Sequence, residues 1–251
     1  MKIGSAQRPP KFGFTLIALM TVVVLLFLLG STFLPALRTA KKRADQMRCL
    51  NNLKQVGLGV LQYLPDNNDT FPACASRNTY GFQPEDWIYW RTNRPGYSVE
   101  KSPTAKYMPS FSTNKVRCPA DRDDRERRLT SSDSHGPYMY SYSMLSLSGG
   151  TNALGMSSII SSGVKHYFKQ EAIRNPANKL MLVEEQTSHK RNESIDPGGS
   201  SSIIGDGRFV PGSDKMTARH DKRGQTTFAD GHAENVRPRI TDIAKFSVPT
   251  L

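Results

Sequence analysis

The chain begins with a short basic leader that is followed by a long apolar run. Between Lys11 and Arg38, the 26 residues from Phe12 to Leu37 carry no formal charge. A helix rises about 1.5 Å per residue, so roughly 20 apolar residues cross a bilayer core of about 30 Å. The segment 14–34 is that long. The pattern therefore predicts one membrane-spanning helix near the N-terminus.

The apolar positions after this run keep the spacing of a helix. They fall at 37, 40, 44, 47, 50, 53, 57, 60/61 and 64, in the steps of three and four that place side chains on one face. Pro35 is expected to bend the helix without ending it, and Pro65 is expected to stop it. We therefore predict one helix over 14–64, which forms the spine for a globular head over 65–251.

Strand signals in the head are short. The apolar run Lys179–Glu185 lies between polar residues and predicts a buried strand. Gln225–Ala229 and His232–Val236 are predicted to form a hairpin, with Asp230-Gly231 as a two-residue type I′ turn and Gly231 at positive φ. This turn sets two cross-strand pairs: Phe228 with Ala233, and Ala229 with His232. The predicted fold class is α+β, a long helix packed on a mainly antiparallel sheet.

Three polar segments are predicted to be loops. Asp121–Arg128 alternates in charge and is expected to be solvated, while Ser141–Gly163 and Asp196–Gly207 are rich in serine and glycine. The aromatic residues between Trp87 and Trp90 have two interpretations, a stacking platform for a base or sugar ring or a part of the core. The core interpretation is favoured.

Composition restricts the classes of function. The net charge is +12, of which +9 belongs to residues 38–251, and this excess favours acidic partners such as anionic lipid headgroups or nucleic acid. More cations follow the apolar run than precede it, so the positive-inside rule alone would place the head in the cytoplasm. No nucleophile elbow, zinc-protease motif, Walker loop or dinucleotide fingerprint is present, which indicates a protein that is not an enzyme.

The front of the chain resembles type IV prepilins and pseudopilins. The matching features are the basic leader, the sequence Gly13-Phe14-Thr15-Leu16-Ile17 and the apolar run behind it. The resemblance implies that a prepilin peptidase removes residues 1–13 between Gly13 and Phe14, and that the new amine of Phe14 is methylated. It also implies a single-pass protein of the bacterial inner membrane, with the head in the periplasm or outside, against the charge rule. An uncleaved anchor is the alternative.

The C-terminal part resembles a family of prepilin-like proteins named for an H-x9-D-G signature. His220 is followed by nine residues and then by Asp230-Gly231, and Cys49 precedes an asparagine pair as it often does in that family. For an exported head, the resemblance implies a disulfide between Cys49 and Cys118. Cys74 remains a rival partner.

The signature residues also have two interpretations. His220, Asp230 and His232, with Glu184 or Glu185 from the neighbouring strand, suit zinc or a similar divalent cation. Alternatively, His220 and Asp230 form a hydrogen bond across the turn and lock it, as turn residues commonly do. The second interpretation is favoured, so no cofactor is expected.

The resemblance implies a structural function. The chain is expected to join or cap a filament of a type II secretion or type IV pilus-like system, with prepilin peptidase, other filament subunits and membrane lipid as partners. Ala18 stands where the family usually has a glutamate, so polymerisation stays open. The alternatives are a DNA-uptake pseudopilin that binds nucleic acid and a membrane-anchored, metal-dependent hydrolase.

Overall fold

The computed structural model describes residues 15–77, 79–122, 124–130, 135–146, 155–160, 163, 165–187 and 205–251. The predicted leader over 1–13 and both residues of the predicted cleavage site, Gly13 and Phe14, lie outside these ranges. Contacts within the chain define two compact units, residues 1–43 and residues 44–251.

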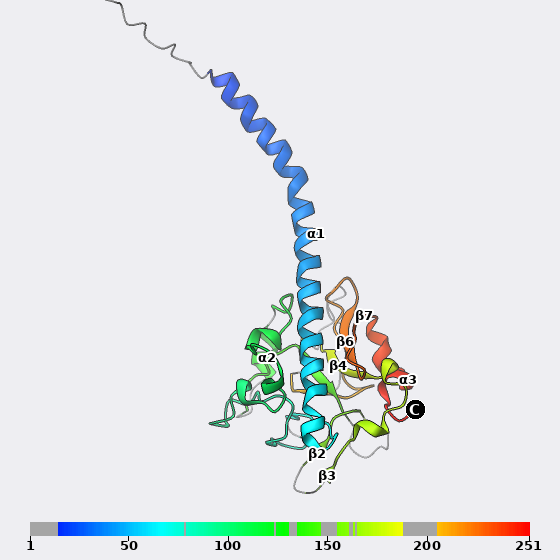
Figure 1. Cartoon of the computed structure of the whole chain (residues 1–251). Helices are drawn as coiled ribbons and strands as arrows, with labels where there is room; N and C mark the ends of the chain where they lie inside the picture. Colours follow the sequence, from blue (N-terminus) through cyan, green and yellow to red (C-terminus); the bar gives the residue numbers. More distant parts are fainter. Residues whose placement is uncertain are drawn as a thin grey trace, which may run out of the picture. The chain divides into compact units, whose positions relative to one another are not determined.

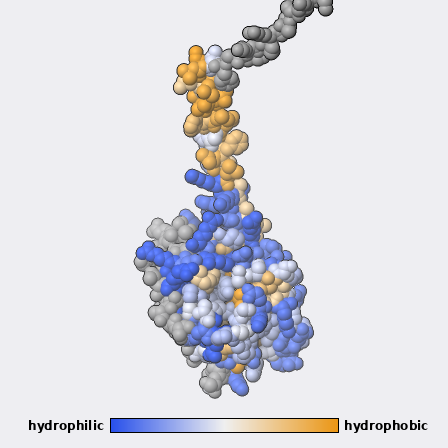
Figure 2. All heavy atoms as spheres, turned by 90° about the vertical axis from the view of Figure 1, so that its left-hand side faces the viewer, coloured by the Kyte–Doolittle hydropathy of each residue, from blue (hydrophilic) through white to orange (hydrophobic). Residues whose placement is uncertain are grey.

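Helix α1 runs from Leu16 to Tyr63 and belongs to both units (Figure 1). It continues through Pro35, as predicted, and it ends just before Pro65. In the first unit, the large apolar side chains between Leu16 and Leu37 are exposed, and they form the apolar surface of this segment in Figure 2. This part of α1 is long and apolar enough to cross a membrane.

In the second unit, one face of α1 is buried in the head. The fully buried residues on this face are Cys49, Leu53, Val56, Val60 and, just beyond the helix, Leu64. Their steps of three and four confirm an amphipathic helix, and the predicted stripe is buried at its positions 53, 57, 60 and 64. Met47 is 64% exposed and Leu50 is only half-buried. The predicted stripe is therefore confirmed from Leu53 onward, whereas before Leu53 the buried position is Cys49.

Two glycines let α1 approach the rest of the head closely. A Cβ on Gly57 would lie 3.0 Å from Cγ2 of Thr227, and a Cβ on Gly59 would lie 2.6 Å from Cγ of Met108. Glycine lowers helix stability by about 1 kcal/mol relative to alanine. The close packing explains why these two positions in the helix carry no side chain.

The head is built on a five-stranded sheet in the order β5-β1-β4-β6-β7. Its strands are β1 (Tyr142–Leu145), β4 (Leu180–Glu184), β5 (Arg208–Phe209), β6 (Gly224–Phe228) and β7 (Ala233–Val236). Only the β1–β5 pair is parallel. The α+β class and the mainly antiparallel sheet agree with the prediction, and β4 confirms the predicted buried strand.

Shorter elements complete the described part of the head. A separate two-stranded sheet pairs β2 (Ile159–Ile160) with β3 (Lys165–His166), and the short helices are α2 (Arg125–Thr130) and α3 (Ala244–Ser247). The 3₁₀-helices span Pro65–Asn67, Val99–Lys101, Ala105–Tyr107, Thr113–Lys115, Gln170–Ala172, Pro176–Asn178 and Pro238–Asp242.

Two hydrophobic clusters form the core of the head. The larger cluster joins the buried face of α1 to Trp87, Trp90, Tyr142 and Leu182, and the smaller one joins Leu145, Leu180, Val183, Phe209 and Phe228 to residues near α3. Trp87 is fully buried and Trp90 is 7% exposed. The core interpretation of these aromatic residues is therefore confirmed.

Two segments predicted to be loops contain regular structure. Strands β1 and β2 lie within 141–163, and α2 begins within Asp121–Arg128. Asp121 and Arg127 are buried, and their side chains form an ion pair at 2.7 Å. The loop predictions were wrong at these elements because charges that alternate in sequence can still pair in the interior, and because serines can be buried when they are hydrogen-bonded. Residues 147–154, and residues 196–204 of the third predicted loop, lie outside the described ranges.

The C-terminal hairpin forms, but its register differs from the prediction by one residue. Thr227 pairs with Ala233, and the backbone N–H of Phe228 donates to the carbonyl of His232 at 2.9 Å. The loop therefore has three residues, 229–231, with Gly231 at φ 90°, where the prediction had two. The positive φ is confirmed and the predicted cross-strand pairs are wrong.

Candidate functional site

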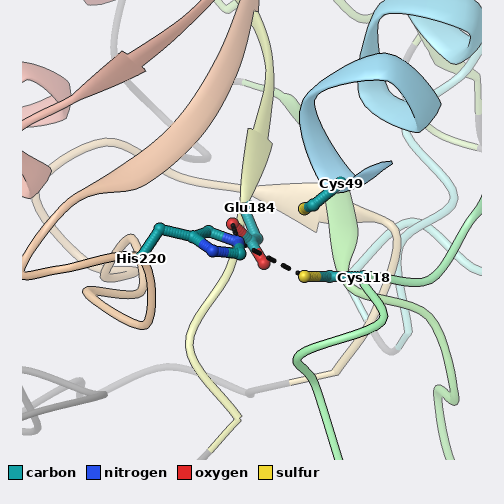
Figure 3. Close-up of side chains that lie close together, drawn as sticks. All are labelled: Cys49, Cys118, Glu184 and His220. Atoms are coloured by element: carbon teal, nitrogen blue, oxygen red, sulfur yellow. Dashed lines mark hydrogen bonds and ion pairs between the residues drawn. The ribbon is translucent and has the colours of Figure 1, made fainter. Parts of the chain in front are cut away.

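Four buried side chains meet between α1, β4 and the turn before β6. They are Cys49, Cys118, Glu184 and His220, and one sulfur, oxygen or nitrogen atom from each lies within 4.8 Å of the others (Figure 3). Their exposed fractions are 0%, 1%, 0% and 4%, respectively. We call this set the Cys₂GluHis cluster. Its residues combine two thiols, a carboxylate and an imidazole in a space closed to solvent.

Each member is held by a different part of the fold. Cys49 lies on the buried face of α1, and Glu184 is the last residue of β4. His220 begins a tight turn that its backbone closes with reciprocal hydrogen bonds to Arg223. The two residues inside this turn, Asp221 and Lys222, have φ values of 54° and 61°. Residues other than glycine adopt such positive φ values only at a cost in free energy.

Cys118 is fixed through the residue that precedes β1. Its backbone N–H donates to Oγ of Ser141 at 2.9 Å, and the backbone N–H of Ser141 donates to the carbonyl of Val116 at 3.1 Å. These bonds tie the segment around Cys118 to the N-terminal end of β1. The thiol therefore faces the cluster from a defined backbone position.

The imidazole of His220 contacts two members of the cluster with a single atom. Its Nε2 lies 3.3 Å from Sγ of Cys118 and 3.2 Å from Oε2 of Glu184. Sγ of Cys49 lies 3.3 Å from the phenol oxygen of Tyr142, and this phenol donates to the carbonyl of Cys49 at 3.2 Å. The cluster is thus both internally connected and held from outside.

Burial and neighbouring groups shift the pKa values of the cluster in different directions. Burial lowers the pKa of His220, but hydrogen bonds with Cys118 and Glu184 outweigh it and raise that pKa to about 9. Burial raises the pKa of Cys49 well above its usual range. Burial also raises the pKa of Cys118, yet the neighbours Cys49, His220 and Arg219 bring it below its ordinary value. The neighbours therefore make Cys118 the more readily ionised of the two thiols, beside an imidazole whose pKa is raised.

A network of buried charges surrounds the cluster. Arg219 lies with Nη1 2.9 Å from Oδ2 of Asp121 and with Nε 3.4 Å from Oε1 of Glu184. Asp121 also pairs with Arg127 at 2.7 Å and accepts a hydrogen bond from Ser141. Burial raises the pKa of Asp121, but the charges of Arg219 and Arg127 lower it far more, so this carboxylate is ionised.

The structure separates His220 from the other predicted signature residues. His220 precedes β6, whereas Asp230 and His232 follow it at the opposite end of that strand. Nδ1 of His232 lies 2.5 Å from Oδ1 of Asp230, and its ring stacks on Phe228 with a centroid distance of 4.2 Å. The predicted hydrogen bond between His220 and Asp230 is not formed, and the predicted three-residue ligand set does not converge among the described residues.

Part of the sequence-based hypothesis is retained. Glu184 does come from the neighbouring strand to meet His220, as the metal interpretation supposed. Cys49 and Cys118 were assigned to a disulfide and not to the same site as His220; in the structure both are free thiols. The disulfide stays a prediction. Of the four residues only Glu184 ends an apolar run, so the hydrophobic pattern carried no signal common to the whole cluster.

Comparisons of the chain with family models, with curated proteins and with solved structures give no match. We therefore infer function from this chain's own sequence and geometry.

Proposed function

We propose that the chain is a membrane-anchored structural subunit of the pseudopilin type. One observation carries this proposal: α1 is a single helix with an exposed apolar first part and a second part that is built into the head. One continuous helix is then part of both the membrane anchor and the folded domain.

The exposed apolar part needs a covering other than water. Side chains such as Ile17, Phe27 and Leu37 are 76%, 74% and 64% exposed, and each buried apolar side chain contributes about 1.5–3 kcal/mol when it leaves water. Lipid tails and the apolar helices of neighbouring subunits are similarly apolar. A subunit of this kind can therefore pass from the bilayer into a helical filament core at little hydrophobic cost.

The residues in front of the helix support the same proposal. The sequence Gly13-Phe14 directly precedes the apolar run, as it does in the prepilins that this chain resembles. Ala18, which replaces the usual glutamate, places no charge in the apolar segment. We infer that the head, and not an ion pair at position 18, supplies the specificity for neighbouring subunits.

The burial of the Cys₂GluHis cluster supports a role without catalysis. His220, its most exposed member, is only 4% exposed, so none of the four groups reaches a substrate in solution. A metal-dependent hydrolase would need an open coordination position at the metal. We therefore assign the cluster to the stability of the head.

Cleavage at Gly13 tests the proposal. The full chain is produced in a bacterial host with and without a prepilin peptidase, and the protein extracted from membranes is measured by intact-mass and N-terminal mass spectrometry. We expect loss of residues 1–13 and a methylated Phe14 only when the peptidase is present. The matched variant Gly13→Val is expected to keep its leader. Recovery of the wild-type chain with its leader intact in the presence of the peptidase would identify an uncleaved anchor.

A second measurement tests the location of the head. Protease added to spheroplasts is expected to digest residues 65–251 from the outside while a cytoplasmic marker stays intact. Digestion only after the inner membrane is permeabilised would place the head in the cytoplasm, as the distribution of flanking cations suggests, and would contradict the proposed function.

A further inference from the structure

We propose that Cys49, Cys118, Glu184 and His220 bind one Zn²⁺ ion that joins α1 to the sheet of the head. This ligand set differs from the one expected from the C-terminal signature, which combined His220 with Asp230 and His232. It also gives Cys49 and Cys118 a role other than the expected disulfide. Such a site is independent of leader cleavage, so its test and the test of the proposed function can fail separately.

The spacing of the ligand atoms fits a tetrahedral ion. Zinc lies about 2.3 Å from thiolate sulfur and about 2.0–2.2 Å from imidazole nitrogen or carboxylate oxygen, which separates ligand atoms by about 3.3–3.8 Å. Nε2 of His220 lies 3.3 Å from Sγ of Cys118 and 3.2 Å from Oε2 of Glu184. All four ligand atoms lie within 4.8 Å of one another, so small shifts of the side chains would bring them to the distances found around one ion.

The hydrogen bonding of the cluster leaves acceptor atoms without well-directed donors. The single Nε2 of His220 faces both the Cys118 sulfur and a Glu184 oxygen, and one N–H cannot point at two acceptors equally well. Neither carboxylate oxygen of Glu184, a residue with 0% exposure, accepts a well-directed hydrogen bond from the described part of the chain. Arg219 and His220 compensate its charge at 3.4 Å and 3.2 Å, and a metal ion would add direct ligation of a carboxylate oxygen. An ion at the centre would bind all four groups at once.

The donor set selects the kind of metal and the kind of site. Two thiolates with an imidazole favour zinc over magnesium or calcium, which prefer oxygen ligands. Four protein ligands and no exposure describe a closed structural site, in which no position is left for water or substrate. Binding releases the protons that the thiols and the imidazole hold in the metal-free chain.

Groups around the ligands are arranged to orient them. Tyr142 contacts the Cys49 sulfur, Ser141 holds the backbone of Cys118, and Arg219 lies beside the Glu184 carboxylate. Two thiolates and one carboxylate around Zn²⁺ leave a net charge of about −1, and the guanidinium of Arg219 balances it. Outer groups of this type commonly fix ligand orientation in zinc proteins.

The test measures metal and thiols on the same material. The full chain is purified in detergent with an affinity tag that contains no histidine, and zinc is quantified by ICP-MS. We expect about one Zn²⁺ per chain in the wild type and background levels in Cys118→Ala. Two variants serve as matched controls, Cys74→Ser at a buried cysteine outside the cluster and His232→Ala at the exposed histidine. Both are expected to retain zinc.

Thiol counting separates the zinc site from a disulfide. Alkylation of the denatured, chelator-treated wild type without reductant is expected to modify all three cysteines. A mass that shows Cys49 linked to Cys118 would overturn the proposal, as would a wild type without zinc or a Cys118→Ala chain that retains it.

A further measurement keeps the proposal testable if Cys118→Ala fails to fold. Chelation of the wild type is expected to lower its thermal midpoint by several degrees, and Zn²⁺ but not Mg²⁺ is expected to restore it. Cobalt added to the chelated wild type is expected to show thiolate-to-metal charge-transfer absorption. An unchanged midpoint together with no cobalt spectrum would overturn the zinc site.

Discussion

The guanidinium of Arg219 lies 2.9 Å from the carboxylate of Asp121, with both side chains inside the head. Asp121 also pairs with Arg127, and Arg219 also reaches Glu184 of the Cys₂GluHis cluster. The negative charge of Asp121 thus compensates part of the positive charge of two buried arginines. Through Arg127 and Arg219 it also connects α2 to Glu184 of β4. The segment Asp121–Arg128, which looks like a solvated loop in sequence, supports the interior of the head.

Loss of the Asp121 charge is expected to destabilise the head strongly. Asp121→Asn leaves two guanidinium groups buried with less compensation, and breaking a buried pair in this way typically costs about 3–5 kcal/mol. The free energy of unfolding is measured by urea titration of the full chain, followed by the fluorescence of the buried Trp87 and Trp90. Arg122→Met removes the exposed Arg122–Asp45 pair, whose atoms are 3.2 Å apart, and is expected to cost about 1 kcal/mol or less. Similar losses for the two variants would contradict the buried network.

The helix glycine at 59 is expected to be more stabilising than alanine. Gly59→Ala gains about 1 kcal/mol of helix propensity, but its Cβ would lie 2.6 Å from Cγ of Met108, and overpacking typically costs about 1–3 kcal/mol. We expect a net loss of roughly 1 kcal/mol in urea titrations. The double variant Gly59→Ala with Met108→Ala tests the cause, because removal of the clash should make the two changes strongly non-additive. Simple additivity would show that Met108 is not responsible.

Substitution of Gly231 is expected to be more harmful than substitution of another glycine with the same backbone. Gly231 and Gly212 have φ values of 90° and 86°, so alanine is strained at both by about 1–2 kcal/mol. A Cβ at Gly231 would also lie 3.0 Å from Leu61 and 3.3 Å from Leu58 of α1, whereas nothing lies within 4 Å of one at Gly212. We expect Gly231→Ala to lower the thermal midpoint further than Gly212→Ala. Equal shifts would mean that the hairpin does not pack against the helix.

Asp86 is expected to make the head less stable as the pH rises towards neutrality. Burial raises the pKa of Asp86 to about 7, although the backbone N–H groups of Gln83 and Ala75 partly oppose this shift. The unfolded chain releases this proton near pH 4, about 3 units earlier. The stability contributed by protonated Asp86 is therefore complete below about pH 4 and is lost as the pH rises to about 7.

Thermal midpoints between about pH 5 and about pH 7 measure this effect. The wild type is expected to lose stability more steeply over this range than Asp86→Asn, which cannot ionise there. Glu85→Gln alters the exposed neighbour, whose charge raises the pKa of Asp86 less than burial does, and it is expected to keep most of the wild-type slope. A slope that is unchanged in Asp86→Asn would show that this carboxylate is already ionised in the folded head.

The local patterns of the sequence determined the long helix, the buried strand and the positive φ of Gly231. Each depends on residues that are close together in the chain: an uncharged run, a proline after Leu64, an apolar segment between polar ends, and an Asp-Gly turn. Hydrophobic periodicity and turn chemistry act over a few residues, so they can be read without the fold.

The tertiary structure decided the register of the hairpin. The backbone N–H of Ala229 donates to the carbonyl of Lys179 at 2.8 Å, next to β4. This bond draws Ala229 toward the start of β4, and the loop then closes with three residues. Phe228 stacks on His232 as a result. A hairpin considered alone has no Lys179, so its sequence could not indicate this register.

The tertiary structure also decided which chemistry the signature histidine takes part in. Sequence reasoning placed His220 with Asp230 and His232, which are near it in the chain, and paired Cys49 with Cys118 separately. The fold brings His220, both cysteines and Glu184 within 4.8 Å, from positions up to 171 residues apart, the interval from 49 to 220. Sequence order fixes local geometry, but only packing of α1 against the sheet determines which distant side chains share a buried site.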